Sequence, residues 1–137
     1  MRIAFGSDEE TPLTVVMRSH LEGLGHEVVQ LAQGREWPEV GRQVGEAVAT
    51  GQVERGVVCC YTGTGVAMAA NKVTGVRAAL CTDAATAAGS RRWNDSNVLA
   101  MGLRLASDVV ASEMLDAFMT TEVDESEIEA IARVESP

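Results

Sequence analysis

The chain has 137 residues, of which 46% are hydrophobic and 23% charged, and its formal net charge is −9. This length and composition predict a single globular domain over residues 1–137, with a core of its own. The negative charge argues against binding to nucleic acid or to anionic membrane surfaces, because both repel an acidic protein. No apolar run approaches the roughly 20 residues that a membrane-spanning helix needs.

The start of the chain and its cysteines favour a cytoplasmic protein. Arg2 leads directly into the strand-like run Ile3–Phe5, so we expect no secretory leader. Cys59, Cys60 and Cys81 all lie in apolar runs that resemble strands. An odd number of cysteines in a chain without an export signal indicates reduced thiols.

Short apolar runs alternate with amphipathic segments along the whole chain. After Pro12, for example, Leu13, Met17 and Leu21 recur at helical spacing until Gly25 ends the pattern. We expect Thr11, Asp83 and Ser107 to cap helices. In chain order, the predicted segments are a strand at 2–7, a helix at 12–24, a strand at 27–31, a loop at 33–38, a helix at 40–51, a strand at 56–60, a helix at 64–73, a strand at 76–81, a helix at 83–92, a strand at 97–101, a helix at 107–119 and an acidic helix at about 122–135.

This alternation predicts an α/β fold. Strands and helices joined by short links form a parallel sheet with helices on both faces. We therefore expect a single-domain, Rossmann-like, three-layer αβα sandwich with a five-stranded parallel sheet and an extra C-terminal helix. Functional sites of such sheets lie at the carboxyl ends of the strands. Asp8, Cys60, Thr62 and the segment 93–95 are expected to converge there.

The most informative stretch runs from Gly56 to Lys72. A buried strand ends at Cys60, the turn Thr62–Gly65 follows, and a helix begins. Backbone N–H groups at such a helix start lack intrahelical acceptors, so the turn can bind an anion or a developing oxyanion. From the residues alone, a simple tight bend is an equally good interpretation. Met68 occupies the third position of a GxGxxG pattern and no Walker lysine follows, so we expect no nucleotide, and the chain predicts no cofactor or metal.

This stretch resembles the centre of the ribose-5-phosphate isomerase B family, which includes both subunits of galactose-6-phosphate isomerase. The family pattern is Cys-Gly-Thr-Gly-x-Gly followed by an apolar stretch that ends in Asn-Lys. This chain has Cys-Tyr-Thr-Gly-Thr-Gly at 60–65 and Asn71-Lys72 at the end of the helix. Further matching pieces extend the resemblance over nearly the whole chain. It implies an aldose–ketose isomerase that moves a proton between C1 and C2 of a small sugar or sugar phosphate through an enediolate.

The resemblance also implies roles for individual residues. Cys60 matches the cysteine whose thiolate is the base; on its own, it would more often be a small core residue. Asp8 matches the aspartate that binds a substrate hydroxyl, and Thr62 belongs to the turn that holds the oxyanion. We therefore predict Cys60, Thr62 and Asp8 as catalytic residues. The predicted substrate-binding residues are Glu9, Tyr61, Gly63, Thr64, Gly65, Trp93, Asn94 and Arg104.

Three departures from the family bear on the substrate. Glu9 replaces a histidine after the first strand. Trp93 replaces the histidine that helps to open the sugar ring, and indole has no useful proton affinity. The tail is acidic where the family has phosphate-binding arginines. Loss of the ring-opening histidine favours an open-chain substrate such as a four-carbon ketose phosphate, and the acidic tail favours less negative charge, even an unphosphorylated sugar. The alternative is a non-catalytic or partner-dependent subunit of a galactose-6-phosphate isomerase-like complex.

The resemblance also implies an assembly. Arg104 matches an arginine that contacts the substrate phosphate from the neighbouring subunit, although an ordinary solvated loop arginine is an equally good interpretation. We therefore expect a homodimer or tetramer with the active site at the subunit interface. Arg91 and Arg92 are expected to border the site and to compensate in part for the missing cations of the tail.

Overall fold

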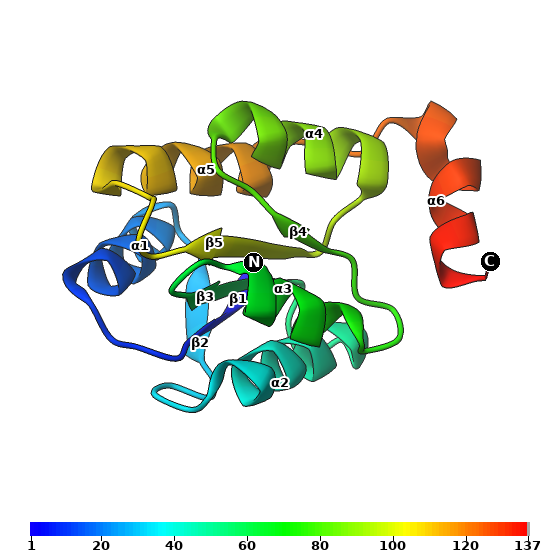
Figure 1. The fold of residues 1–137 in the computed structure, drawn as a ribbon. Helices are drawn as coiled ribbons and strands as arrows, with labels where there is room; N and C mark the ends of the chain where they lie inside the picture. Colours follow the sequence, from blue (N-terminus) through cyan, green and yellow to red (C-terminus); the bar gives the residue numbers. More distant parts are fainter. Residues whose placement is uncertain (137) are drawn as a thin grey trace.

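Five parallel strands form one sheet that helices cover on both faces (Figure 1). The computed structural model describes residues 1–136. The strand order is β2-β1-β3-β5-β4, and every neighbouring pair is parallel. This arrangement confirms the predicted three-layer α/β fold. The elements are β1 Arg2–Ser7, α1 Pro12–Gly23, β2 Glu27–Gln30, α2 Trp37–Ala49, β3 Arg55–Cys60, α3 Thr64–Asn71, β4 Ala78–Leu80, α4 Ala84–Asn94, β5 Val98–Gly102, α5 Asp108–Thr120, a 3₁₀ turn Glu125–Glu127 and α6 Ile128–Glu135.

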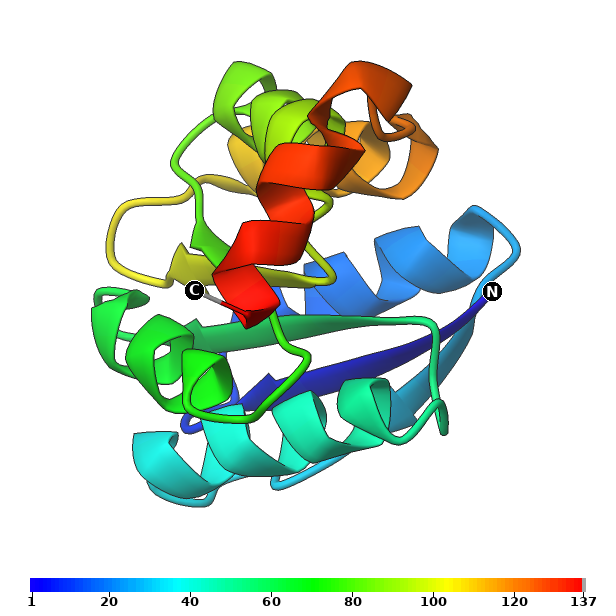
Figure 2. The same ribbon diagram turned by 90° about the vertical axis from the view of Figure 1, so that its right-hand side faces the viewer.

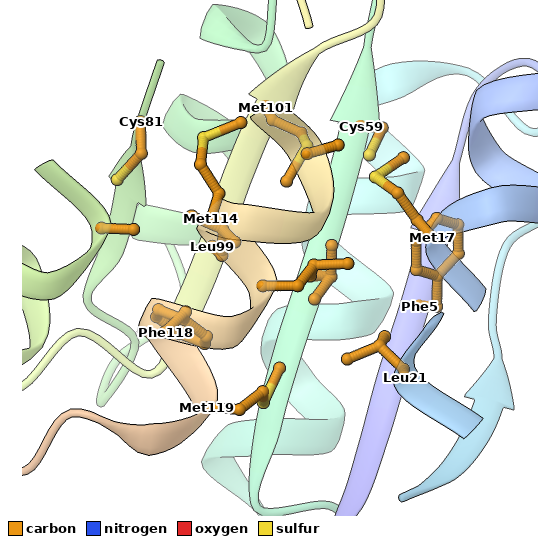
Figure 3. Packing of buried hydrophobic residues seen from close by; sticks show 14 of the residues in the cluster. Phe5, Met17, Leu21, Cys59, Cys81, Leu99, Met101, Met114, Phe118 and Met119 are labelled. Atoms are coloured by element: carbon orange, nitrogen blue, oxygen red, sulfur yellow. The ribbon is translucent and has the colours of Figure 1, made fainter. Parts of the chain in front are cut away.

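The sheet lies between two layers of helices (Figure 2), and a hydrophobic core lies on each of its faces. Helices α1, α4 and α5 pack on one face around Phe5, Leu99 and Phe118 (Figure 3). Helices α2 and α3 pack on the other face. Because side chains alternate along a strand, Cys59 lies in the first core and Cys60 in the second. Only one of these two neighbours can therefore serve a given site.

Helix starts follow the sequence signals closely. Thr11 and Thr14 form a reciprocal capping pair at the start of α1. Asp83 accepts the Thr86 N–H at 2.7 Å, and Ser107 caps α5. Each side chain satisfies a backbone donor that has no intrahelical partner, and such a cap contributes about 1 kcal/mol. All three predicted caps are confirmed.

Three boundaries differ from the prediction. Helix α2 already begins at Trp37, inside the loop predicted at 33–38, because proline is well tolerated in a first helical turn. Strand β4 is limited to Ala78–Leu80, since the Asn97 side chain takes the Arg77 N–H at 2.8 Å. The final helix starts later than 122, because Asp124 accepts the N–H of Ser126 and so begins a 3₁₀ turn.

The last helix, α6, lies over the edge of the sheet where the strands begin (Figure 2). Glu135 anchors it: its carboxylate is 2.7 Å from Arg77 Nη1 and also accepts the Gly75 N–H. No helix within residues 1–136 is long and apolar enough to cross a membrane.

Candidate active site

The turn between β3 and α3 is built around Gly63. Its φ of +79° lies in the left-handed region, and it is the N-cap residue of α3, so no side chain caps the helix. A Cβ at this position would lie 2.6 Å from Leu80 Cδ1 and 2.8 Å from the Gly102 nitrogen. Only glycine therefore fits. The N–H groups of the first turn of α3 are left to a ligand, at the positive end of the helix dipole.

The end of β5 holds this turn in place. A Cβ on Gly102 would lie 2.7 Å from the carbonyl carbon and oxygen of Thr62, so two glycine positions pack backbone against backbone. The Leu103 N–H donates to the Cys60 carbonyl at 2.9 Å, and the Arg104 N–H donates to the Tyr61 carbonyl at 3.0 Å. The turn is therefore fixed by backbone at the end of β5, which is far away in sequence. Within it, the hydroxyls of Thr62 and Thr64 are 2.9 Å apart.

Cys60 lies at the carboxyl end of β3, directly before this turn, and is 5% exposed. Its neighbour Cys59 is fully buried on the opposite face. Burial, followed by the proximity of Cys60 and Asp8, raises the pKa of the Cys59 thiol far above its ordinary value. Cys59 therefore stays protonated, and Cys60 is the cysteine whose side chain lies on the α2–α3 face, directly before the turn that starts α3.

Asp8 directly follows β1, the strand that pairs with the Cys60 strand β3. Its N–H donates to the Cys59 carbonyl at 3.3 Å, and the Ser7 hydroxyl donates to the Glu9 carbonyl, which shapes the turn. Asp8 Oδ1 is buried and has no hydrogen-bond partner within residues 1–136. Burial, with a smaller effect of Glu9, raises the pKa of the Asp8 carboxyl. This carboxyl can accept a hydrogen bond from a hydroxyl, whereas Glu9 is exposed.

Trp37 joins the site although the sequence analysis assigned it no role. Its indole lies against Gly65, where a Cβ would be 2.8 Å from Trp37 Cε3. Trp37 begins α2 and Gly65 lies in the first turn of α3, so both belong to the edge that holds Cys60. The ring is 45% exposed and forms a wall beside the turn. The sequence signal for this contact is Gly65, because a glycine in the first turn of a helix can mark a close approach of another group.

The segment 93–95 does not converge with Cys60 within one chain, contrary to the prediction. Helix α4 runs antiparallel to the strands and returns the chain to the end of the sheet at which the strands begin. There Arg77 Nε donates to the Asp95 carbonyl at 2.9 Å, and the Asn97 N–H donates to the Arg77 carbonyl. Trp93 is 54% exposed, and it and Asn94 line a groove along β4.

The arginines lie at opposite ends of the strands. Arg104 lies beside Tyr61, on the same edge and in the same chain as Cys60, with its guanidinium carbon 5.6 Å from the ring centroid. Arg91 is 5% exposed and binds Asp95 at 2.7 Å at the opposite edge. It therefore does not border the turn, and the expectation that it compensates for the tail is wrong.

These groups suit chemistry at a carbonyl. A cysteine precedes a helix start that has no side-chain cap, and a carboxyl follows the adjacent strand. A proton can move to and from the sulfur while the N–H groups stabilise a negative oxygen. Within residues 1–136, no three His, Cys, Asp or Glu side chains gather as metal ligands.

Fold and site together define a Rossmann-like α/β protein with a cysteine before a glycine-built turn at the carboxyl ends of its strands. Within that class, the profile of the Ribose/Galactose Isomerase family matches residues 3–136, and the chain belongs to this family.

Individual relatives agree with this assignment. Ribose-5-phosphate isomerase B of Escherichia coli is 35% identical over 143 residues, covering 98% of this chain and 96% of the relative. The 4-deoxy-4-sulfo-D-erythrose isomerase of Clostridium sp. MSTE9 is 32% identical over 127 residues, covering 88% and 80%. The structure of Clostridium thermocellum ribose-5-phosphate isomerase B superposes with a TM-score of 0.93 at 33% identity, covering 99% of this chain and 96% of that one.

Proposed function

We propose that this protein is an aldose–ketose isomerase that uses Cys60 as the base to move a proton between C1 and C2 of a small, anion-bearing sugar. The observation that carries the proposal is the position of the Cys60 thiol before an uncapped helix start that is fixed by Gly63 and Gly102. Membership of the isomerase family supports the same reaction.

The groups of the site divide the reaction between them. The Cys60 thiolate takes the proton from the carbon next to the carbonyl and later returns it to the former carbonyl carbon, while the hydroxyl proton of the first carbon passes to the former carbonyl oxygen. The enediolate oxygen that forms meanwhile accepts hydrogen bonds from the N–H groups of the turn Thr62–Gly65. Asp8 accepts a hydrogen bond from a substrate hydroxyl and so orients the chain of the sugar. Electrostatic stabilisation of such an oxyanion contributes about 10²–10³-fold per donor.

The preferred substrate in this proposal is an open-chain, four-carbon sugar. Trp93 stands where a ring-opening acid–base group is expected, and its indole cannot carry a proton. The relative from Clostridium sp. MSTE9 carries the name of an enzyme that acts on a four-carbon sugar with a sulfonate. Such a substrate needs no ring opening and bears less charge than a phosphate dianion, which suits the acidic tail of this chain.

We further propose that a second copy of the chain completes each site. The cavity that Thr62 lines has a volume of about 50 Å³, too small for a sugar. Strand β4 is an edge strand, and Leu80, Met68 and Trp93 are exposed beside it. A second chain that packs on this apolar edge buries these side chains. It can also bring its own Trp93 and Asn94 to the Cys60 end of the sheet, which they do not reach within one chain.

Two experiments test the proposal. The first is a coupled assay with tetrose, pentose and hexose substrates, each with and without an anionic group. We expect the highest kcat/KM on a four-carbon anionic sugar and a value well below it on ribose 5-phosphate. Equal or higher efficiency on ribose 5-phosphate would contradict the assigned role of Trp93. Absence of turnover on every sugar would contradict the function itself.

The second experiment tests the shared site. Cys60→Ser and Asn94→Ala chains are each expected to be nearly inactive as homodimers. Refolded together, they form mixed dimers in which one of the two sites contains both Cys60 and Asn94. We therefore expect activity to reappear on mixing, whereas a mixture that stays inactive would mean that each site is built from one chain.

The alternative, a non-catalytic subunit that needs a different partner chain, is less well supported, because Cys60, the turn and Asn94 are all present in this chain. The proposal also places the protein in the cytoplasm, where its three unpaired cysteines would stay reduced.

A further inference from the structure

Tyr61 stands where the family pattern has glycine, and its ring lies next to the guanidinium of Arg104. The guanidinium carbon is 5.6 Å from the ring centroid. Two neighbouring backbone hydrogen bonds, from Leu103 to Cys60 and from Arg104 to Tyr61, set the register of the two segments. The pair is therefore placed by main chain, immediately beside the residue that we propose as the base.

Arg104 is available to bind an anion. None of the ion pairs within residues 1–136 involves Arg104, whereas Arg18, Arg42 and Arg77 are each paired with a carboxylate. Stacking on an aromatic ring occupies the flat face of a guanidinium. Its N–H donors lie in the plane of the group, so they remain free for a bidentate contact with an oxyanion.

The Tyr61 ring contacts Arg104 at the surface and does not pack into the hydrophobic core. Its side chain is 61% exposed, and no hydrogen bond of its hydroxyl is found within residues 1–136. An exposed arginine samples many rotamers, and each contact that it makes with a ligand must first order the side chain. A ring that holds the guanidinium in one place reduces that cost.

We propose that Tyr61 is a positioning residue that holds Arg104 ready for a tetrahedral oxyanion, either phosphate or sulfonate, at the end of the substrate remote from C1. This inference rests on the proposed isomerase function for the identity of the substrate. It assigns Tyr61 the orientation of Arg104 and assigns no step of proton transfer to it.

The expected magnitudes separate the two residues. Loss of a cation–π contact at an exposed site corresponds to about a 2–5-fold weaker binding of the anion. Loss of the charged donor itself corresponds to about a 10–100-fold weaker binding. If Tyr61 acts only through Arg104, removing the ring from a chain that already lacks Arg104 should have no further effect.

The test compares Tyr61→Leu, Tyr61→Phe, Arg104→Gln and the Tyr61→Leu/Arg104→Gln double variant. Calorimetric titration with inorganic phosphate and, separately, with methanesulfonate measures anion affinity without catalysis. We expect Tyr61→Leu to weaken binding about 2–5-fold, Tyr61→Phe to restore it, and the double variant to match Arg104→Gln. On the best substrate, Tyr61→Leu should raise KM by more than it lowers kcat. Val109→Ala, which removes another exposed apolar side chain at the start of α5, is the matched control.

The outcomes are distinguishable from those of the proposed function. If the wild-type chain turns over no sugar, the isomerase proposal fails, and the anion titrations still decide the role of Tyr61. Additive losses in the double variant, or no loss in Tyr61→Leu, would overturn the positioning role even in an active enzyme. Tighter binding of phosphate than of methanesulfonate identifies phosphate as the preferred group, and the reverse order identifies sulfonate.

Discussion

Gly63→Ala tests whether the oxyanion-binding turn is held by the backbone of β5. The substitution has two costs. A φ of +79° costs a residue with a side chain about 1–2 kcal/mol. The new Cβ would also lie within 2.8 Å of the Gly102 nitrogen and the Met101 carbonyl carbon. Overpacking against main chain that cannot rotate away adds about 1–3 kcal/mol. We therefore expect a loss of about 2–5 kcal/mol in the free energy of unfolding.

Gly51→Ala is a matched control, because Gly51 has a φ of +75° and a Cβ added there would have no atom within 4 Å. It should lose only the conformational part, about 1–2 kcal/mol. Urea denaturation of both variants gives the difference, which isolates the contact with β5. Turnover should fall by about 100-fold in Gly63→Ala, since a shift of about 1 Å in a positioning group has that effect, and stay near wild type in Gly51→Ala. Equal stability and full turnover in both variants would refute the reasoning.

Four further outcomes are expected. Cys60→Ser should keep its circular dichroism spectrum and lose turnover, whereas Cys59→Ser should retain turnover, because Cys59 lies on the other face of the sheet. Asp8→Asn should become more stable relative to wild type as the pH rises. Because the pKa of Asp8 is raised in the folded state, folding of the wild type is favoured while Asp8 is protonated, and this contribution is lost as the carboxyl ionises. The difference between the urea midpoints of the two proteins should therefore change from pH 4 to pH 7. Asn71→Leu leaves the Ala78 N–H and carbonyl without their side-chain partner and should cost about 1–3 kcal/mol, measured by thermal unfolding. Leu80→Asp should give a monomer by light scattering and reduce activity, and an active, dimeric Leu80→Asp variant would contradict the proposed interface.

Much of the fold follows from local patterns. Alternating apolar runs predict the parallel sheet, and Thr11, Asp83 and Ser107 act as caps through contacts within three residues. Two boundary errors, at the starts of α2 and α6, come from local signals that were not recognised, and one comes from a distant side chain. Asn97 ends the pairing of β4 through a bond 20 residues away in sequence, and no local pattern contains that information.

The site was predictable to the extent that it lies on one edge of the sheet. Cys60, the turn and Asp8 follow neighbouring strands, so their sequence positions already place them together. Asn94 was misplaced because the end of a helix in an α/β fold returns to the opposite edge, a property of topology and not of any motif. Trp37 was missed because its contact with Gly65 joins the starts of two helices that are far apart in sequence.

The placement of Cys60 and Asn94 at opposite ends of the strands has an evolutionary consequence. In a dimer that shares its sites, each chain contributes Cys60 to one site and Asn94 to the other. After gene duplication, one copy could lose its cysteine half and the other its asparagine half without loss of the reaction, provided that the two copies assemble with each other. The topology of this fold therefore offers a short route from a self-sufficient homodimer to an enzyme made of two different and mutually dependent subunits.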